Sequence, residues 1–384
     1  MRPYQRGMSM KYDIAAFIWP SYTGDEPRTR IFWPEGYGEW QTVKAMTNKG
    51  YEGCRWPRIP TWGYVNEADS RVMEMQIRCA VDYGVNVFIY DWYWYDNRPF
   101  LENCLNDGFL KARNNTDMKF MLMWANHDAT HLWDKRNSDS DLSTVIWSGV
   151  VTPEIFSNIC DRTIEKYFKK ENYYTIDGCP VYMIFDLDNF IRSFGTSQEC
   201  KKAIEEFRRK TVEAGFRGLH FQVVYWGNKV FNWLSDNDEC KGCKEYELYS
   251  YLGIDSVTNY NWGGSVHFDG DYKDLTEKYC QRLEEATEKL DIPYYPNISV
   301  GWDNNVRFYD YMPGVVTNNT PENFKAACEK VKAFTDNSMS KGIMKAPLIT
   351  VNSWNEWTET SYLQPDDLYG YGYLEAIKDV FKDW

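Results

Sequence analysis

Short apolar runs alternate with longer amphipathic stretches along most of the chain. The runs are rich in Val, Ile, Phe and Tyr and almost continuously apolar, which is typical of parallel strands covered on both faces. Eight such runs lie at residues 14–19, 85–90, 119–124, 181–185, 219–225, 254–260, 296–301 and 348–352. We therefore expect eight buried strands spread over the whole chain.

The stretches between the runs carry apolar residues at the spacing of amphipathic helices. We expect helices over 68–83, 153–173, 198–214, 272–290, 321–337 and 371–381, a shorter one before residue 254, and one that starts near Pro99. Thr152 is a favourable N-cap for the helix that follows it. Pro99 suits a first helical position.

Eight strand–helix repeats predict an α/β protein with a (β/α)8 TIM barrel. The chain contains no Pro-, Ser- or Gly-rich linker, so we expect a single domain over residues 1–384. Within it, residues 1–11 are predicted to be a disordered N-terminal segment and residues 21–66 an elaborated loop. Active sites of TIM barrels lie at the C-terminal ends of the strands, so the residues that follow each run are the candidates for function.

Composition narrows the class of ligand. The chain of 384 residues has 43 Lys and Arg against 56 Asp and Glu, a formal net charge of −13, which argues against a nucleic-acid partner. Aromatic residues make up 17% of the chain. That is more than a core needs, and surplus Trp and Tyr are typical of sites that bind sugars.

The chain shows no segment that predicts a membrane partner. No apolar run approaches the roughly 18 residues of a membrane-spanning helix. Residues 1–10 have no apolar stretch after their arginines, so no signal peptide is expected in the chain as written. The chain is then cytoplasmic, or periplasmic or secreted if a leader was removed. Its oligomeric state stays open.

Nearly every predicted strand is followed by an aromatic residue together with an amide or an acid. This arrangement around the rim of a barrel predicts a carbohydrate cleft. We expect substrate contacts from Trp19, Asp91, Tyr93, Trp94, Trp124, Asn126, His127, Asp186, Trp226, Tyr260, Trp302, Asp303, Asn304, Asn355 and Trp357. Asp303 has an alternative role, which is to orient Asn304 and Arg307.

Glu356 and Glu359 are the strongest candidates for catalysis. They follow the last predicted strand three residues apart, so in a helical turn they share one face. Glycoside hydrolysis needs two carboxylates at one anomeric carbon, and a close pair suits a retaining outcome. Like charges this close also raise the pKa of one partner, which keeps a general acid protonated near neutrality. The alternative is a solvated helix start, which Trp354 and Trp357 on either side disfavour.

Several motifs resemble those of one family. They are Gly38-Glu39-Trp40, Trp92-Tyr93-Trp94, Trp124-Ala125-Asn126, Gly301-Trp302-Asp303-Asn304, Asn355-Glu356-Trp357-Thr358-Glu359 and Tyr369-Gly370-Tyr371-Gly372-Tyr373-Leu374-Glu375. In this order they resemble elements of glycoside hydrolase family 99, the endo-α-mannosidases and endo-α-mannanases, and more closely its relatives called WbsX-like glycosyltransferases. The resemblance covers about residues 13–381. It adds Glu39, Trp40 and Tyr371 to the expected substrate contacts.

The resemblance implies a TIM barrel and a retaining mechanism that acts on an α-linked glycan, mannan-like or related. In family 99 the first acid of the N-E-W-x-E element deprotonates the sugar 2-hydroxyl, which attacks the anomeric carbon and forms a 1,2-anhydro sugar. The second acid protonates the leaving group and then activates water. Carried over, Glu356 is the base and Glu359 the acid and base. Thr360 stands where the family has Gly, and Gln364 where it has an acid, so the identity of the sugar stays open.

Other motifs predict less specific chemistry. His127 and His131 have a spacing that binds zinc on a helix, and Asp186-Leu187-Asp188 has the Asp-x-Asp form used by nucleotide-sugar transferases. Cys240 and Cys243 form one pair without a second, which predicts a local disulfide or free thiols. We expect neither metal nor cofactor. The rival functions are a WbsX-like glycosyltransferase in polysaccharide biosynthesis and a non-catalytic glycan-binding barrel.

Overall fold

The computed structural model of the chain describes residues 11–24, 26–48, 50, 55, 58–133, 140–227 and 229–382. The N-terminal segment that we expected to be disordered lies, apart from Lys11, outside the described residues.

A parallel sheet forms the centre of the molecule. Its strands are β1 (Asp13–Ile18), β2 (Val87–Tyr95), β4 (Lys119–Trp124), β8 (Cys179–Ile184), β9 (His220–Val224), β10 (Ser256–Thr258), β12 (Tyr294–Tyr295), β13 (Asn297–Ser299) and β15 (Leu348–Asn352). They pair in the order β12-β10-β9-β8-β4-β2-β1-β15-β13. Each predicted strand is confirmed, with shifts of a few residues at the ends.

The two ends of this order are one strand interrupted by a proline. β12 pairs with β10 (Val257 opposite Tyr294), whereas β13 pairs with β15 (Asn297 opposite Thr350). Between them lies Pro296, which has no N–H to donate to a neighbouring strand, although its carbonyl still accepts from the Thr350 N–H at 3.0 Å. The sheet therefore closes on itself, and the predicted TIM barrel is confirmed.

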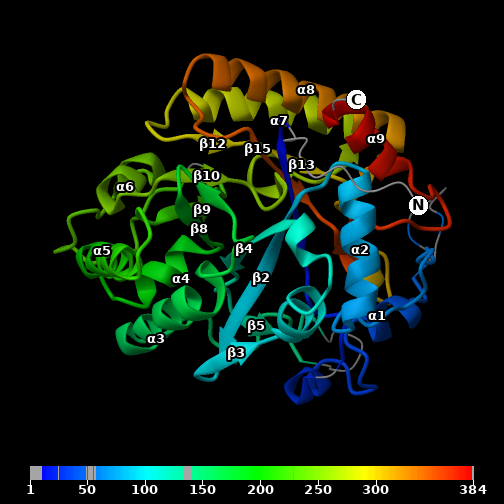
Figure 1. Cartoon of the computed structure of the whole chain (residues 1–384), viewed down its shortest axis with the longest axis horizontal. Helices are drawn as coiled ribbons and strands as arrows, with labels where there is room; N and C mark the ends of the chain where they lie inside the picture. Colours follow the sequence, from blue (N-terminus) through cyan, green and yellow to red (C-terminus); the bar gives the residue numbers. More distant parts are fainter. Residues whose placement is uncertain are drawn as a thin grey trace.

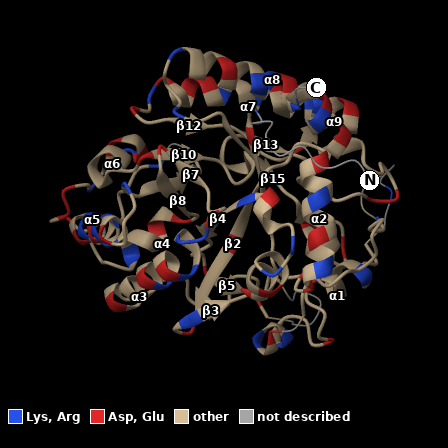
Figure 2. Ribbon diagram, in the orientation of Figure 1, with Lys and Arg blue, Asp and Glu red and all other residues tan. Residues whose placement is uncertain are grey.

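Helices surround the barrel (Figure 1). They are α1 (Trp40–Lys44), α2 (Ser70–Asp82), α3 (Pro153–Thr163), α4 (Leu187–Arg192), α5 (Ser197–Glu213), α6 (Glu245–Leu252), α7 (Tyr272–Thr287), α8 (Pro321–Ser340) and α9 (Gly372–Phe381). Lys and Arg, Asp and Glu lie mainly on these helices and on the loops, whereas the strands are almost free of charge (Figure 2). The N-cap at Thr152 is confirmed, since its side chain accepts from the Ile155 N–H at 3.3 Å.

Shorter elements decorate the ends of the barrel. The strands are β3 (Arg98–Phe100), β5 (Ala129–Thr130), β6 (Val145–Trp147), β7 (Thr175–Ile176), β11 (Gly270–Asp271), β14 (Val316–Thr317), β16 (Asn355–Glu356) and β17 (Ser361–Tyr362). The 3-10 turns are η1 (Pro27–Ile31), η3 (Asn115–Asp117), η5 (Trp262–Gly264), η6 (Asn304–Arg307) and η7 (Trp357–Glu359), and η2 (Cys104–Phe109) and η4 (Ile164–Phe168) are π-helical.

The helix predicted to start near Pro99 starts later, as η2 at Cys104, because the strand β3 comes first. β3 turns back onto β2 as an antiparallel hairpin, with Tyr95 opposite Arg98. The two turn residues, Asp96 and Asn97, have φ of +53° and +57°, as a type I′ hairpin turn requires. The turn extends β2 to Tyr95, so residues expected in a loop belong to the strand.

None of the described helices combines the length and the apolar character needed to cross a membrane.

Candidate active site

A cavity of about 210 Å³ opens at the C-terminal end of the barrel. Its walls come from the last residues of the strands, the residues just after them, and the turns η6 and η7. The lining residues are Trp19, Asp91, Tyr93, Met123, Ala125, His127, Leu132, Trp133, Phe185, Tyr260, Arg307, Glu356 and Glu359.

Arg307 is the centre of the charge arrangement in this cavity. Its guanidinium is 4% exposed and contacts three carboxylates: Nη1 lies 2.9 Å from Glu359 Oε1, Nη2 lies 3.2 Å from Glu356 Oε1, and Nε lies 3.6 Å from Glu39 Oε1. These charges raise the pKa of Arg307 although burial opposes them, so the guanidinium stays cationic. One arginine thus links an N-terminal acid to both acids of the last strand exit.

A glycine brings Glu39 into the site. Gly38 has φ of +60°, and a Cβ there would lie 1.7 Å from the Ser21 carbonyl oxygen. Only glycine allows this close approach of two backbones. The next residue, Glu39, is fully buried, accepts a hydrogen bond from Trp19 Nε1, and faces Arg307. Burial raises the pKa of Glu39, and Arg307 opposes that shift.

A tyrosine joins Asp91 to Glu356 on the other side. The Tyr260 hydroxyl lies 3.0 Å from Asp91 Oδ2 and 3.3 Å from Glu356 Oε2. Burial raises the pKa of Asp91 well above its usual range. Burial also raises the pKa of Glu356, together with the charge of Glu359 and against the charge of Arg307. The close pair was expected to raise the pKa of the general acid, whereas the raised pKa found here belongs to Glu356, which the resemblance makes the base.

Two buried carboxylate oxygens of the cavity lining have no hydrogen-bond partner among the described residues. They are Asp91 Oδ1 and Glu359 Oε2. Buried acceptors of this kind are costly unless something donates to them. The cavity therefore offers two acceptors to a ligand that carries hydroxyl groups or to water.

The structure brings together eight of the predicted site residues. Around this cavity and its charge centre lie Trp19, Glu39, Asp91, Tyr93, His127, Tyr260, Glu356 and Glu359. The ring of His127 packs edge-on against Tyr93 and Phe185, and its Nδ1 lies 2.9 Å from the Asp128 carbonyl oxygen. Burial lowers the pKa of His127, which favours the neutral ring.

Two predicted tryptophans point away from the cavity. Asp91 and Tyr93 line it, so the alternation along β2 turns Trp94 to the other face. On β4, Trp124 stacks on Phe156 of α3 with ring centroids 5.9 Å apart. Trp124 thus belongs to the packing between the barrel and its outer layer, whereas Trp94 packs against Trp92 with ring centroids 5.7 Å apart.

Three predicted residues, Asn126, Asp186 and Asn355, fasten neighbouring strand exits to each other. Asn126 donates to the Asp186 carbonyl at 2.7 Å and accepts from its N–H at 2.8 Å, and the Asp186 side chain caps α4. Asn355 makes the same two bonds to the Trp19 backbone, at 2.9 and 2.8 Å. These residues lie outside the cavity lining and support it.

Trp226, Trp302 and Asp303 also lie behind the cavity. Trp226 Nε1 donates to the Phe185 carbonyl at 2.8 Å, and Trp302 stacks on Phe268 with centroids 5.2 Å apart. Asp303 caps η6, because its Oδ1 accepts from the N–H of Asn305 at 3.0 Å. Of the two roles predicted for Asp303, the geometry fits the orienting one: η6 begins at Asn304 and ends at Arg307.

Trp40 and Trp357 form part of the packing under the last strand exit. Their rings lie 5.8 Å apart, and Trp357 also stacks on Tyr362 with centroids 3.8 Å apart. Both indoles are 2% exposed. They hold the backbone that carries Glu356 and do not line the cavity.

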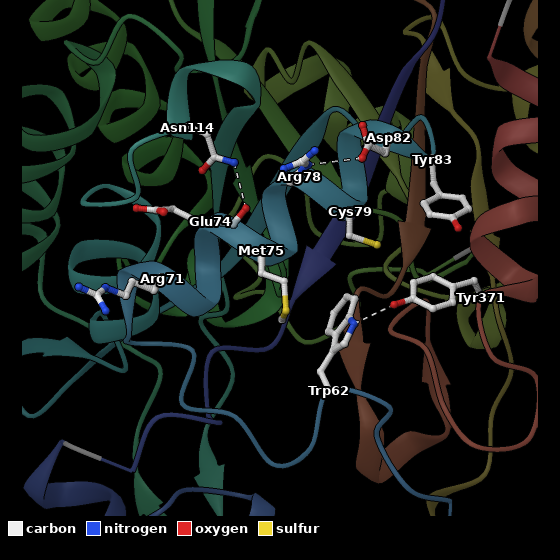
Figure 3. Close-up of a pocket in the computed structure, with 10 residues that line it drawn as sticks. All are labelled: Trp62, Arg71, Glu74, Met75, Arg78, Cys79, Asp82, Tyr83, Asn114 and Tyr371. Atoms are coloured by element: carbon white, nitrogen blue, oxygen red, sulfur yellow. Dashed lines mark hydrogen bonds and ion pairs between the residues drawn. The ribbon is translucent and has the colours of Figure 1, made fainter. Parts of the chain in front are cut away.

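Tyr371 lies on the flank of the molecule, in a different hollow. It accepts from Trp62 Nε1 at 3.0 Å and stacks on Tyr83 with centroids 5.7 Å apart. These rings border an open hollow of about 660 Å³ along α2, whose other walls include Glu74 and Arg78 (Figure 3). Tyr371 is thus not brought together with Glu356 and Glu359.

The predicted metal-like motifs and the cysteine pair do not form a metal site among the described residues. Among the described residues, no group of three or more His, Cys, Asp and Glu side chains is arranged to hold a metal ion. Asp188 pairs with Lys229 at 3.0 Å and accepts from Trp233 Nε1. Cys240 and Cys243 are free thiols, and burial raises the pKa of Cys240 to about 11.

Arg307 is the main site residue that sequence reasoning missed. The motif Gly301–Asn304 ends three residues before it, and no local pattern marks a buried arginine. Trp133 and Phe185 were missed as well, since neither belongs to a quoted motif. An excess of acids at one barrel mouth was the available signal, because buried carboxylates require a cation.

Comparison with known proteins places the chain in a family. Residues 14–377 match the family described as glycosyltransferase WbsX. The chain belongs to this WbsX family. Two curated relatives, both named "Uncharacterized protein WxcX" and from two strains of Xanthomonas campestris pv. campestris, are 23% identical over 96% of this chain. The chain spans about half the length of these relatives, since the match covers 49% of each.

Solved structures share the fold of this WbsX-family chain. A "glycoside hydrolase-like protein" aligns with a TM-score of 0.57 at 14% identity, over 98% of this chain and 96% of the other. The GH99 endo-alpha-mannosidase from Bacteroides thetaiotaomicron aligns with a TM-score of 0.53 at 11% identity, over 97% of both chains. At these identities the likeness establishes the TIM-barrel fold.

Proposed function

We propose that this chain is a retaining glycoside hydrolase that cleaves an uncharged, α-linked glycan, mannan-like or related. One observation carries the proposal: Glu356 and Glu359 share the guanidinium of Arg307 at the wall of a cavity at the catalytic end of a TIM barrel. Neighbouring nitrogens of one side chain hold both carboxylates, and a close carboxylate pair supports a retaining outcome.

In the proposed reaction Glu356 is the base. It takes the proton of the sugar 2-hydroxyl, the freed oxygen bonds to the anomeric carbon, and the bond from that carbon to the leaving oxygen breaks. A carboxyl group whose pKa is raised is a stronger base than an ordinary one. The product of this step is a 1,2-anhydro sugar.

Glu359 protonates the departing oxygen in the same step. Its Oε2 has no hydrogen-bond partner among the described residues, which supports a role in carrying this proton. In the second step Glu359 takes a proton from water, the water oxygen bonds to the anomeric carbon, the bond from that carbon to the 2-oxygen breaks, and the 2-oxygen recovers its proton from Glu356. Each of the two displacements inverts the configuration at the anomeric carbon, so the product retains the configuration of the substrate.

The charge of the cavity favours hydrolysis over transfer from a nucleotide sugar. Of the described residues, only Arg307 forms ion pairs with the acids Glu39, Glu356 and Glu359, and Asp91 has no ion-pair partner. A diphosphate would add negative charge where acids already exceed cations. The family description as a glycosyltransferase nevertheless makes transfer the rival to test, with a sugar hydroxyl in place of water.

Activity should be measured on α-linked oligosaccharides and on nucleotide sugars with the wild type, Glu356→Gln, Glu359→Gln and the surface control Glu154→Gln. We expect release of reducing sugar by the wild type and the control, and losses of about 10³-fold or more in both site variants. Glu359→Gln should retain more activity on an aryl glycoside, whose leaving group needs no proton. A 2-deoxy substrate should not react.

Turnover of nucleotide sugars alone would show a transferase, and glycan binding without turnover would show a binding barrel.

A further inference from the structure

Another buried acid, Glu67, is bonded to Asn355, the residue just before Glu356, and has no role in the proposed reaction. Glu67 lies just before α2 in the sequence and is fully buried. It accepts three hydrogen bonds from side-chain amides. Gln76 Nε2 and Gln364 Nε2 lie 3.1 and 2.8 Å from its Oε1, and Asn355 Nδ2 lies 2.8 Å from its Oε2.

Each of these amides has its orientation fixed from the far side. Gln76 Oε1 accepts from Trp354 Nε1 at 2.8 Å, and Gln364 Oε1 accepts from Trp357 Nε1 at 2.7 Å. Asn355 Oδ1 accepts from the Trp19 backbone N–H at 2.8 Å. Indole and backbone N–H groups are donors only, so the oxygen of every amide must face them and every NH2 must face Glu67.

The three NH2 groups therefore need both oxygens of Glu67 to act as hydrogen-bond acceptors. An ionised carboxylate accepts only and meets that need. A protonated carboxyl, or an amide in its place, would turn a hydrogen toward an NH2 group and lose a bond. A buried donor left without an acceptor costs roughly 1–3 kcal/mol.

The residues fastened in this way surround Glu356 in the chain. Asn355 is bonded to Glu67 directly, and Trp354 and Trp357 are bonded through Gln76 and Gln364. Since Glu356 lies between them, a shift of this segment moves its carboxyl relative to Arg307.

We propose that Glu67 is a positioning residue that holds the segment Trp354–Trp357 in place only while it is ionised, so that a proton on Glu67 releases Glu356 from its working position. For catalysis this rests on the proposed function. The side chain of Glu67 makes no hydrogen bond or ion pair to a described residue of the cavity lining, and in this proposal it transfers no proton to substrate.

The surroundings make Glu67 able to change its charge near neutral pH. Burial raises its pKa to about 7, and the three amides oppose that shift because they favour the ionised form. If their bonds break while Glu67 stays buried, its pKa rises further, so a proton on Glu67 favours the released arrangement. The titratable groups that face it are Cys104, Tyr22 and Tyr90, and burial raises the pKa of each, so all three are neutral. The described residues supply no ion-pair partner for Glu67. Between pH 5.5 and 8, Glu67 is therefore the group in this cluster whose charge changes.

Amide hydrogen exchange of the peptide covering residues 352–363 tests the proposal without any substrate. The rates are corrected for intrinsic pH dependence and measured at pH 5.5 and 8. In the wild type we expect at least fivefold slower exchange at pH 8. Glu67→Gln should exchange fast at both values. Wild-type exchange that does not change with pH would overturn the proposal, whether or not the variant folds.

A matched control is available in Glu245. It is also a buried carboxyl whose pKa is raised by burial to about 7, and it accepts from the Tyr249 hydroxyl at 2.6 Å, away from residues 354–357. Glu245→Gln should leave the exchange of residues 352–363 unchanged. An equal effect of both substitutions would mean a general loss of stability and would overturn the positioning role.

A kinetic arm separates this proposal from the proposed function. On the glycan that the wild type cleaves, kcat should fall about tenfold in Glu67→Gln, and the acid limb of the wild-type pH profile near 7 should disappear, with KM changed less than kcat. Glu67→Asp, which keeps the charge, should recover part of kcat. If no glycan is cleaved, the exchange arm still decides the role of Glu67. Unchanged kcat together with altered exchange would overturn positioning.

Discussion

At the scale of single residues, Thr360 shows how a small departure from a family motif affects the site. It follows Glu359 directly and has φ of +53°, a left-handed conformation that costs a non-glycine residue roughly 1–2 kcal/mol. Glycine, which stands at this position in the resembled motif of glycoside hydrolase family 99, avoids that cost. The Thr360 hydroxyl offsets part of it, because it donates to the Asp303 carbonyl at 2.8 Å and so fastens η7 to the turn that carries Arg307.

We predict that Thr360→Ala is less stable than Thr360→Gly by about 1 kcal/mol. Alanine keeps the strained conformation and loses the hydroxyl, whereas glycine loses the hydroxyl and relieves the strain. Denaturant unfolding of both variants and the wild type measures the difference. Equal free energies of unfolding for the two variants would mean that this backbone position carries no strain.

At the scale of elements, the caps of short turns determine where charged groups lie. Asp303 caps η6 through Asn305, and the turn ends at Arg307. Thr152 caps α3 in the same manner, away from the cavity. Loss of either cap costs stability, but only η6 carries a residue that contacts Glu356 and Glu359.

We predict that Asp303→Ala and Thr152→Ala each lower the free energy of unfolding by about 1 kcal/mol, while only Asp303→Ala lowers kcat, by about tenfold or more. The two variants are compared by denaturant unfolding and by steady-state kinetics on the same glycan. Full activity in Asp303→Ala would mean that the ion pairs of Arg307 are sufficient to hold it without the cap.

At the scale of the whole molecule, negative charge continues from the surface into the site. The chain has a net charge of −13. The cavity region places Glu39, Glu356 and Glu359 around one guanidinium, and Asp91 lies in the same cavity lining. Charges buried in this way are screened by salt less than those at the surface. The site should therefore discriminate ligands by charge even at physiological ionic strength.

We predict that a monosaccharide mimic with a ring ammonium binds about tenfold or more tightly than its neutral parent, and that an analogue with a carboxylate shows no measurable binding. Calorimetry at low and high salt compares the three. Glu359→Gln should reduce the gain of the cationic mimic and leave the neutral sugar nearly unchanged. Binding of the anionic analogue as tightly as the neutral one would contradict a net negative site.

Part of the site was readable from local sequence. The pair Glu356 and Glu359 follows the last strand in the chain, so their proximity needs no long-range information. Trp19, Asp91, Tyr93, His127 and Tyr260 were found because parallel strands of a barrel bring all their C-terminal ends to one mouth. Trp94 and Trp124 were placed at the same mouth by the same rule, yet they point outward. Both faces of a barrel strand are apolar, so the sequence does not tell which parity of residues faces inward.

The sequence by itself determined the eight strands of the barrel, their order and the longer helices between them, because hydrophobic periodicity reports which faces of each element are buried. Only the tertiary structure decided the partners of the buried charges. Arg307 meets Glu39 and Glu356, and Glu67 meets Asn355, which is 288 residues away in the chain. Buried ions and amides must find complementary groups wherever the fold brings them, and closure of the barrel joins its first and last strands. No local pattern can record a contact that exists only after that closure.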